Sequence, residues 1–337
     1  MLQEVFRIGN IPIYGYGVMM VIGFLTAVQV AKFLAKRSRI DPEIFVNAAL
    51  IALIAGVAGA RISHVLENLP EYTRTDRSFA ANFFAMINVR SGGLTFYGGL
   101  ILAFPIVLYY GWIKKVNLRL GMDIVAPCVT LGLAFGRIGC LLNGCCYGAE
   151  CNLPWAVRFP YQSIPYSDQV YRHEIAPPKE LLVADLDGER LVTQSEIKAG
   201  KTERRVELAD GKVVRETMPL DEKVRAEARA ERSLPLHPAQ VYSALNSFLI
   251  TAILIAFFTM RPSHGRVMAL MLMLEGPTRF LLEMVRAEPP VVGPMSLSMV
   301  IGLGLAVIGI IMWFAFGPRG SGVRPERRIA QPQPRPA

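Results

Sequence analysis

Seven apolar stretches, each close to twenty residues long, constrain the fold of this 337-residue chain more than any other feature. A helix that crosses the hydrocarbon core of a bilayer needs roughly 20 predominantly apolar residues. Here 52% of the residues are hydrophobic, and the mean hydropathy is +0.35. The stretches cover residues 11–34, 44–66, 91–112, 122–142, 240–260, 267–285 and 297–316. We therefore predict an all-α integral membrane protein with seven transmembrane helices.

Basic residues predict the orientation of these helices. The net charge of +9 is compatible with nucleic-acid binding. However, lysines and arginines follow the first, third, fifth and seventh stretches, which is the pattern of cytoplasmic loops. We therefore expect the N-terminus outside, the C-terminus in the cytoplasm, and the lipid bilayer rather than nucleic acid as the partner of the positive charge. Residues 1–12 read as a short arm without the pattern of a cleavable signal peptide, so the first stretch is expected to be retained.

The residues between the fourth and fifth stretches cannot cross a membrane. They alternate apolar and polar residues, and the pairs Asp187-Gly188 and Asp210-Gly211 favour tight hairpins. Residues 221–232 resemble a charged helix. We predict a small β-rich extracytoplasmic insertion, with a disordered, solvated loop as the alternative. The expected division is 1–142 for helices one to four, 143–239 for a turn and the insertion, 240–317 for helices five to seven, and 318–337 for a disordered cytoplasmic tail. Residues 67–89 are expected to form a polar loop.

Polar residues far apart in the sequence converge on the outer ends of the predicted helices. Charged side chains inside or beside apolar helices are costly and usually have a task. Arginine's planar fork matches a phosphate and stays charged when desolvated, so a phosphate-bearing lipid headgroup is the natural ligand. The alternatives are snorkelling to the interface and structural pairing, since Glu275, Arg279 and Glu283 are spaced four apart. The converging residues are Tyr16, Arg61, Tyr97, Arg137, Asn143, His237, Arg279, Glu283 and Arg286.

Two weaker motifs lie in the same layer. His237-Pro238 opens the fifth stretch, where histidine can act as a base or as a donor to a headgroup. Tyr97 stands between two glycine pairs of the third stretch, which allow another group to approach the backbone closely. An interfacial histidine without function and a tyrosine of the aromatic belt are the alternatives.

Four of the five cysteines fall within twelve residues. They are Cys140, Cys145, Cys146 and Cys151, while Cys128 stands apart. The spacing lacks two separated C-x-x-C units, and vicinal cysteines rarely serve one zinc ion well. A disulfide is possible in an oxidising compartment. We expect small packing residues at a tight turn, no metal and no cofactor.

Together these motifs resemble the prolipoprotein diacylglyceryl transferase family, over all seven stretches in order. The main signature is 136–148, where Arg137, Asn143, Gly144 and Gly148 are in place. Further matches are Tyr14-Gly15-Tyr16-Gly17, Gly59-Ala60-Arg61-Ile62, the glycine frame 92–99, His237-Pro238-Ala239-Gln240-Val241-Tyr242, and the segment 279–286. The insertion and the tail lie outside the resemblance.

The resemblance implies an enzyme of the bacterial inner membrane. Such a transferase moves the sn-1,2-diacylglyceryl group of phosphatidylglycerol to the lipobox cysteine thiol of a prolipoprotein and releases glycerol phosphate. It implies that Arg137 and Arg279 bind the phosphate. It also implies that a headgroup pocket is formed by Tyr16, Arg61, Asn143, Gly148, His237 and Glu283.

The sequence departs from the family pattern near the chemistry. Tyr97 stands where the family commonly has a proposed histidine base, Cys140 where it has asparagine, and Cys145 where it has a carboxylate. Ser243 stands where an acid often follows the His-Pro motif. A phospholipid-binding membrane protein without this catalysis is therefore the alternative function. A transporter is disfavoured, because the stretches show no evident internal repeat.

Overall fold

The computed structural model describes residues 4–8, 11–73, 78–88, 93, 95–185, 188–207, 213–286, 291, 293 and 295–317. The long helices are α1 (Gly15–Arg37), α2 (Pro42–Glu67), α5 (Phe96–Ile113), α6 (Leu118–Asn143), α10 (Ala239–Thr259), α11 (Arg266–Met284) and α12 (Leu297–Ala315). The short helices are α3 (Leu69–Tyr72), α4 (Phe79–Ile87), α7 (Ile164–Tyr171), α8 (Gln194–Ala199), α9 (Glu222–Ala230) and the 3₁₀ turn η2 (Lys179–Leu181). The strands are β1 (Glu4–Ile8), β2 (Ile11–Tyr14), β3 (Leu182–Asp185), β4 (Gly188–Leu191), β5 (Lys201–Glu207) and β6 (Val213–Pro219).

Each of the seven predicted apolar stretches overlaps one long helix. Among the described residues, five helices are long and apolar enough to cross a membrane: α1, α2, α6, α10 and α12. In α5 the apolar run is Tyr97–Ile113, which is shorter. Helix α11 carries Glu275, Arg279 and Glu283 within its apolar sequence. The helical, membrane-type fold is therefore confirmed, with five helices that meet the length and hydropathy of a span.

The chain divides into two compact units. The boundaries between them fall within α1, α6, α10, α11 and α12. The first contains Met1–Phe24, Gly132–Phe248 and Pro277–Gly302, and the second contains Leu25–Leu131, Leu249–Gly276 and Leu303–Ala337. The tail 318–337 lies outside the described residues.

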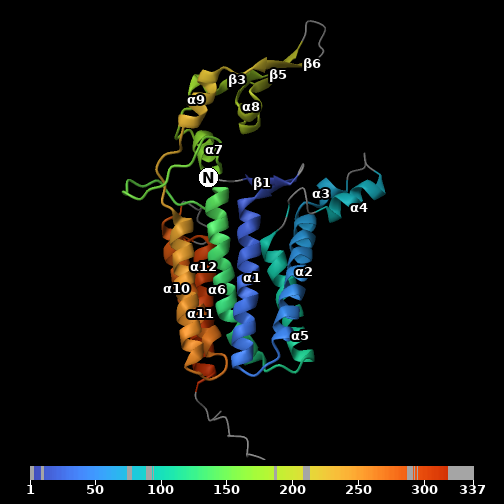
Figure 1. The fold of residues 1–337 in the computed structure, drawn as a ribbon, viewed down its shortest axis with the longest axis vertical. Helices are drawn as coiled ribbons and strands as arrows, with labels where there is room; N and C mark the ends of the chain where they lie inside the picture. The colour runs from blue at the N-terminus through green and yellow to red at the C-terminus, as the bar shows by residue number, and fades with distance from the viewer. Residues whose placement is uncertain are drawn as a thin grey trace, which may run out of the picture. The chain divides into compact units, whose positions relative to one another are not determined.

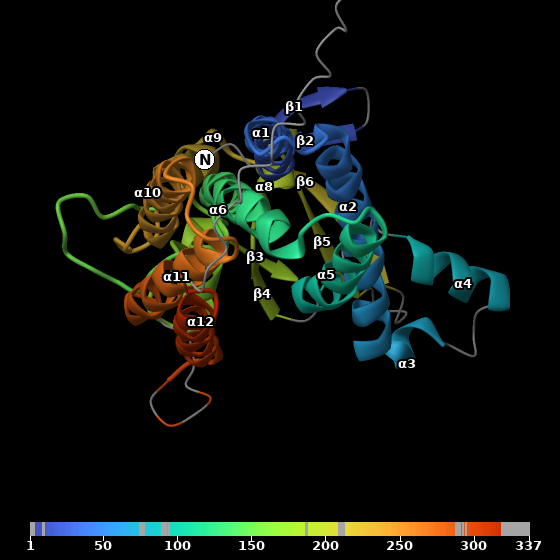
Figure 2. The ribbon, with the colours of Figure 1, turned by 90° about the horizontal axis from the view of Figure 1, so that it is seen from below.

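In the second unit, α2 and α5 pack side by side (Figures 1 and 2). A Cβ atom built on Gly59 would lie 2.5 Å from the carbonyl oxygen of Gly98, and one on Gly99 would lie 2.8 Å from that of Gly56. Side chains at these positions would push the helices apart, so the small residues of both helices permit the close packing that the sequence predicts.

The second unit also holds the larger buried apolar cluster. It includes Leu34 of α1, Ile124 of α6 and Leu254 of α10, each with no exposed surface. The buried carboxylate of Asp123 accepts hydrogen bonds from the backbone amides of Gly265 (2.6 Å) and Met268 (2.9 Å) at the start of α11. Asp123 therefore satisfies amides that a helix N-terminus leaves without intrahelical partners.

Two local predictions at helix ends are wrong. Residues 11–14 form β2, which pairs antiparallel with β1, so the first helix begins at Gly15 rather than at residue 11. The predicted polar loop 67–89 contains α3 and the apolar helix α4, whose N-cap Ser78 accepts a hydrogen bond from the amide of Ala81 at 3.2 Å. The Ser78 cap and the apolar sequence of α4 favour a helix, although polar residues flank it.

The insertion belongs to the first unit and is structured over its described residues. Strands β3 and β4 pair antiparallel, as do β5 and β6, and each pair flanks one of the predicted Asp-Gly sites. Asp187, Asp210 and Gly211 themselves lie outside the described residues. Helix α9 lies within residues 221–232 and confirms the charged helix predicted there. Helix α7 was not predicted, and its Tyr166 packs against Tyr161 and Leu181 in a small buried cluster.

Candidate functional site

The signature segment forms a tight turn after α6. The amide of Cys145 donates to the carbonyl oxygen of Cys140 at 3.1 Å, and Gly144 between them has a φ of 78°. The side chain of Gln240, on α10, donates through Nε2 to the carbonyl oxygen of Cys145 at 2.8 Å. Gln240 is fully buried, so this contact fixes the turn to the start of α10.

Backbone hydrogen bonds bring three predicted motifs together at this turn. The amide of Gly148 donates to the carbonyl of His237 (3.0 Å), and the amide of His237 donates to the carbonyl of Ala149 (2.9 Å). The amide of Ala149 donates to the carbonyl of Val285 at 2.8 Å. The signature turn, the His-Pro motif and the end of α11 therefore form one local structure, as the sequence predicts.

A buried carboxylate organises the end of α11. Glu283 is 2% exposed and lies 3.3 Å from Arg279 and 3.4 Å from Arg286. Ser296 donates to Glu283 at 3.2 Å, and Arg279 donates to the hydroxyl of Ser298 at 2.8 Å. The ion pair between Arg279 and Glu283 confirms the structural pairing that their spacing of four residues predicts. The two serines, which reach the cluster from the region where α12 begins, were not predicted, because no pattern in the sequence marks them.

Arg137 lies near the end of α6. Among the described residues its buried Nε atom has no hydrogen-bond partner. Hydrogen bonding with the thiols of Cys140 and Cys145 lowers the pKa of the Cys146 thiol, and the charges of Arg137 and Arg286 lower it further. The two guanidinium groups therefore make one positively charged neighbourhood beside the signature turn.

Three other predicted residues border this neighbourhood. Tyr16 packs on Gly139, where an added Cβ would lie 3.0 Å from the tyrosine ring, and it is close enough to Arg137 for electrostatic interaction. The side chain of Asn143 hydrogen-bonds the thiol of Cys145. The buried Nδ1 of His237 has no hydrogen-bond partner in the described part of the chain.

Arg61 and Tyr97 belong to the second unit. Arg61 is 6% exposed, and its guanidinium donates to the carbonyls of Ala85 (2.7 Å), Met86 (2.8 Å) and Gly93 (3.0 Å). These bonds tie α2 to the end of α4. Tyr97 is 49% exposed at the start of α5. A role for either residue in substrate binding or catalysis stays a prediction.

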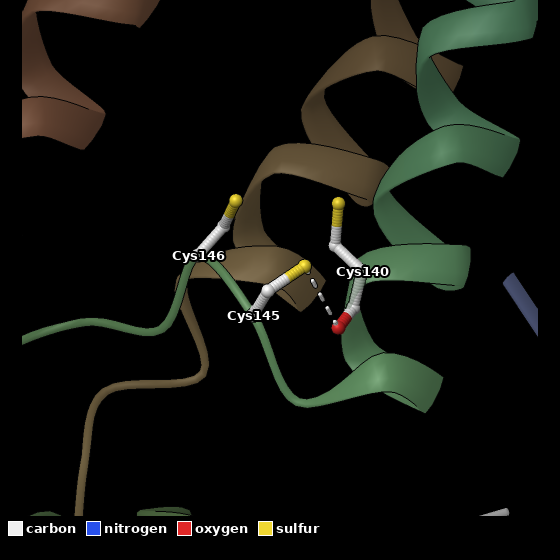
Figure 3. Close-up of side chains that lie close together, drawn as sticks. All are labelled: Cys140, Cys145 and Cys146. Atoms are coloured by element: carbon white, nitrogen blue, oxygen red, sulfur yellow. Dashed lines mark hydrogen bonds between the residues drawn. The ribbon is translucent and has the colours of Figure 1, made fainter. Parts of the chain in front are cut away.

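The three cysteines of the signature turn lie together (Figure 3). Their Sγ atoms are all within 4.8 Å of one another, and the thiol of Cys145 also approaches the carbonyl of Cys140 at 3.8 Å. All five cysteines of the chain are free thiols. Cys146 has a φ of 61°, a left-handed conformation that is uncommon for residues other than glycine. The close approach of all three sulfurs was not predicted.

The apolar helices, together with the buried arginine–glutamate cluster at the end of α11, define a helical membrane protein that carries a polar site. A model of the prolipoprotein diacylglyceryl transferase family matches residues 3–315, and the chain belongs to this family. It is therefore a multi-pass membrane protein.

Curated relatives carry the name phosphatidylglycerol–prolipoprotein diacylglyceryl transferase. The chain is 24% identical to the Clostridium tetani protein, over 93% of this chain and 97% of that one. It is 24% identical to the Finegoldia magna protein, over 91% of this chain and 92% of that one. It is 30% identical to the Rhodopirellula baltica protein over 67% of this chain, and this match spans about half (47%) of that longer relative.

Proposed function

We propose that this chain transfers the sn-1,2-diacylglyceryl group of phosphatidylglycerol to the lipobox cysteine of prolipoproteins, forming a thioether and releasing glycerol phosphate. Family membership supports this reaction. The observation that carries it is the buried Nε of Arg137, which has no protein partner among the described residues. A buried, unsatisfied donor on a cation is costly, and a phosphate oxygen would satisfy it.

In this proposal Arg137 and Arg279 bind the lipid phosphate. As the bond between the glycerol carbon and the phosphate oxygen breaks, negative charge grows on that oxygen, and preorganised cationic donors stabilise it. Glu283 holds Arg279 and Arg286 in place through ion pairs of 3.3 and 3.4 Å. The headgroup pocket would be shaped by Tyr16, Asn143, Gly148 and His237.

The incoming thiol must lose its proton, because the thiolate is the nucleophile. Tyr97 is the candidate base by position in the family pattern. A phenol is a weaker base than the imidazole that the family commonly has at this position. The departure at Tyr97 therefore favours the second candidate, a protein of the same fold that binds phosphatidylglycerol without this turnover.

The proposal includes the membrane arrangement. All seven long helices cross the bacterial inner membrane, with the N-terminus outside and the C-terminus in the cytoplasm, and the insertion faces the extracytoplasmic side. The division into 1–142, 143–239, 240–317 and 318–337 belongs to the same proposal. Cysteines placed singly in the insertion and in the loop between α1 and α2 test it, since a membrane-impermeant thiol reagent should label only the former in intact cells.

An assay with two readouts separates the two candidate functions. Purified protein in phosphatidylglycerol liposomes is given a lipobox peptide, and lipid binding and thioether product are measured on the same sample. Transfer requires both signals. Saturable binding of phosphatidylglycerol with no product above a protein-free control would favour the binding protein.

A further inference from the structure

The strongest unassigned feature of the molecule is the three-cysteine cluster. We propose that Cys140, Cys145 and Cys146 bind one Zn²⁺ ion, and that the open fourth position of this ion takes the substrate thiol and activates it. The second part rests on the function proposed above. The first part concerns only the ion and the three cysteines.

The ligand geometry supports a zinc site. Zinc binds cysteine sulfur at about 2.3 Å in tetrahedral sites, so sulfurs that share one ion must lie within twice that distance of each other. The three Sγ atoms lie within 4.8 Å of one another, close to the separation that a single tetrahedral zinc ion requires (Figure 3). Three protein ligands and one exchangeable position are the pattern of catalytic rather than structural zinc.

The backbone conformation at Cys146 allows two adjacent cysteines to bind the same ion. In extended chain, neighbouring side chains point to opposite sides, which would separate Cys145 from Cys146. The φ of 61° at Cys146 turns the chain so that both thiols approach Cys140. A left-handed non-glycine residue costs about 1–2 kcal/mol, and such strain is found preferentially at functional sites.

Neighbouring groups hold the ligands in place. Gln240 fixes the carbonyl of Cys145 at 2.8 Å, and the Asn143 side chain hydrogen-bonds the Cys145 thiol. Outer contacts of this kind orient metal ligands. In the part of the chain that the structure describes, no fourth Cys, His, Asp or Glu joins the group. The fourth position is therefore left for water or substrate.

The chemistry matches the proposed reaction, which needs a thiolate. A zinc-bound hydroxide takes the proton of the substrate thiol and leaves as water, and the sulfur binds zinc as a thiolate, since a coordinating thiol is deprotonated. This sulfur attacks the glycerol carbon, a carbon–sulfur bond forms, and the carbon–oxygen bond breaks with its electron pair passing to the phosphate oxygen. The neutral thioether leaves zinc, and a water molecule takes its place. This water passes a proton to the departing phosphate, which restores the zinc-bound hydroxide. Zinc would thus do the work of the histidine base that this chain lacks.

Metal binding to the full-length protein in detergent, purified with reductant, tests the site. We expect one Zn²⁺ per chain after dialysis, and Co²⁺ in its place should give the visible spectrum of a tetrahedral thiolate complex. Cys140→Ser, Cys145→Ser and Cys146→Ser should each weaken Zn²⁺ binding at least as much as the roughly 10–100-fold that outer-shell changes cause. Cys128→Ser and Cys151→Ser are matched controls that should leave stoichiometry and affinity unchanged. A stoichiometry well below one, or equal affinity in all five variants, would overturn the site.

The open position is tested with peptides. A lipobox peptide should change the Co²⁺ spectrum, and the same peptide with serine in place of its cysteine should not. A spectrum insensitive to the thiol would overturn thiol activation, and a disulfide between two of the three cysteines in protein isolated without reductant would overturn the site. These spectra precede any turnover. A zinc-loaded protein that binds the peptide thiol without forming thioether would support the zinc site and contradict the proposed transferase function.

Discussion

The backbone amide of Gly148 donates to the carbonyl of His237 at 3.0 Å, in a place where no side chain fits. A Cβ atom on Gly148 would lie 2.5 Å from the Cβ of His237 and 2.9 Å from the carbonyl oxygen of Val285. Gly148→Ala should therefore separate the signature turn from the His-Pro motif, at a cost of about 1–3 kcal/mol. Thermal unfolding in detergent measures this loss.

Gly132→Ala is the matched control for this substitution. Gly132 lies within α6, and an added Cβ would meet nothing within 4 Å. Alanine favours a helix over glycine by roughly 1 kcal/mol, so this variant should be as stable as the parent or more so. Equal stability of Gly148→Ala and the parent protein would contradict the packing described for the turn.

Removing the charge of Glu283 should weaken the arginine cluster. In Glu283→Gln, Arg279 and Arg286 lose the anion that lies 3.3 and 3.4 Å away, in a site where the carboxylate is 2% exposed. Hydrogen bonds to charged groups are worth roughly 1.5–3 kcal/mol, so we expect a loss of about that size in unfolding free energy. Phosphatidylglycerol binding should fall with it. Glu222→Gln, at the exposed start of α9, is the control, and equal effects of both substitutions would argue against a special role for Glu283.

Tyr97→Phe distinguishes activation of the substrate thiol by zinc from activation by a tyrosine base. If zinc activates the thiol, Tyr97→Phe keeps the transfer rate within about twofold and leaves its pH profile unchanged, because general acid–base groups typically contribute 10²–10⁴-fold. Rates across the pH range measure this. A loss of more than about tenfold together with a shifted pH profile would return Tyr97 to the role of base.

The insertion should resist mild acid through Glu196. Burial raises the pKa of this carboxyl, but hydrogen bonds from Arg190, Thr193 and the backbone of Glu203 outweigh burial and hold the pKa well below its usual range. A depressed pKa stabilises the fold above the unfolded value of about 4.3, and this contribution is lost only as the pH falls through the lower folded value. Hydrogen exchange of 188–207, corrected for intrinsic rates, should show equal protection at neutral pH and at about pH 5. Glu196→Gln should lose protection at both, and an unchanged exchange rate in that variant would contradict the assignment.

The helical framework could be predicted because hydropathy alone marks segments that must lie in lipid. The pair Arg279 and Glu283 was predictable from their spacing on one helix face. The two antiparallel strand pairs of the insertion were predictable from the Asp-Gly pairs between them. By contrast, Ile11 to Tyr14 are apolar residues that suit a strand or a helix equally, and only pairing with β1 decides between them.

The features of the site that escaped prediction depend on tertiary geometry. A left-handed Cys146 cannot be predicted from the sequence, because glycine, asparagine and aspartate are the residues that favour this conformation. The convergence of the thiols follows from it. Arg61 was predicted to contribute to headgroup binding near the outer end of its helix. Its carbonyl partners in α4 and at Gly93 come from segments 24 to 32 residues away.

Mass spectrometry of the transfer product determines whether this protein moves a diacylglyceryl group to a lipobox cysteine. The full-length protein is mixed with isotopically labelled phosphatidylglycerol and a lipobox peptide, beside Arg137→Ala and, as a control, Arg37→Ala at the exposed end of α1. We predict a thioether-linked, labelled diacylglyceryl peptide with the parent protein and Arg37→Ala, and a drop of at least about 100-fold with Arg137→Ala. Absence of product with a stable, lipid-binding parent protein, or near-normal turnover with Arg137→Ala, would contradict the account.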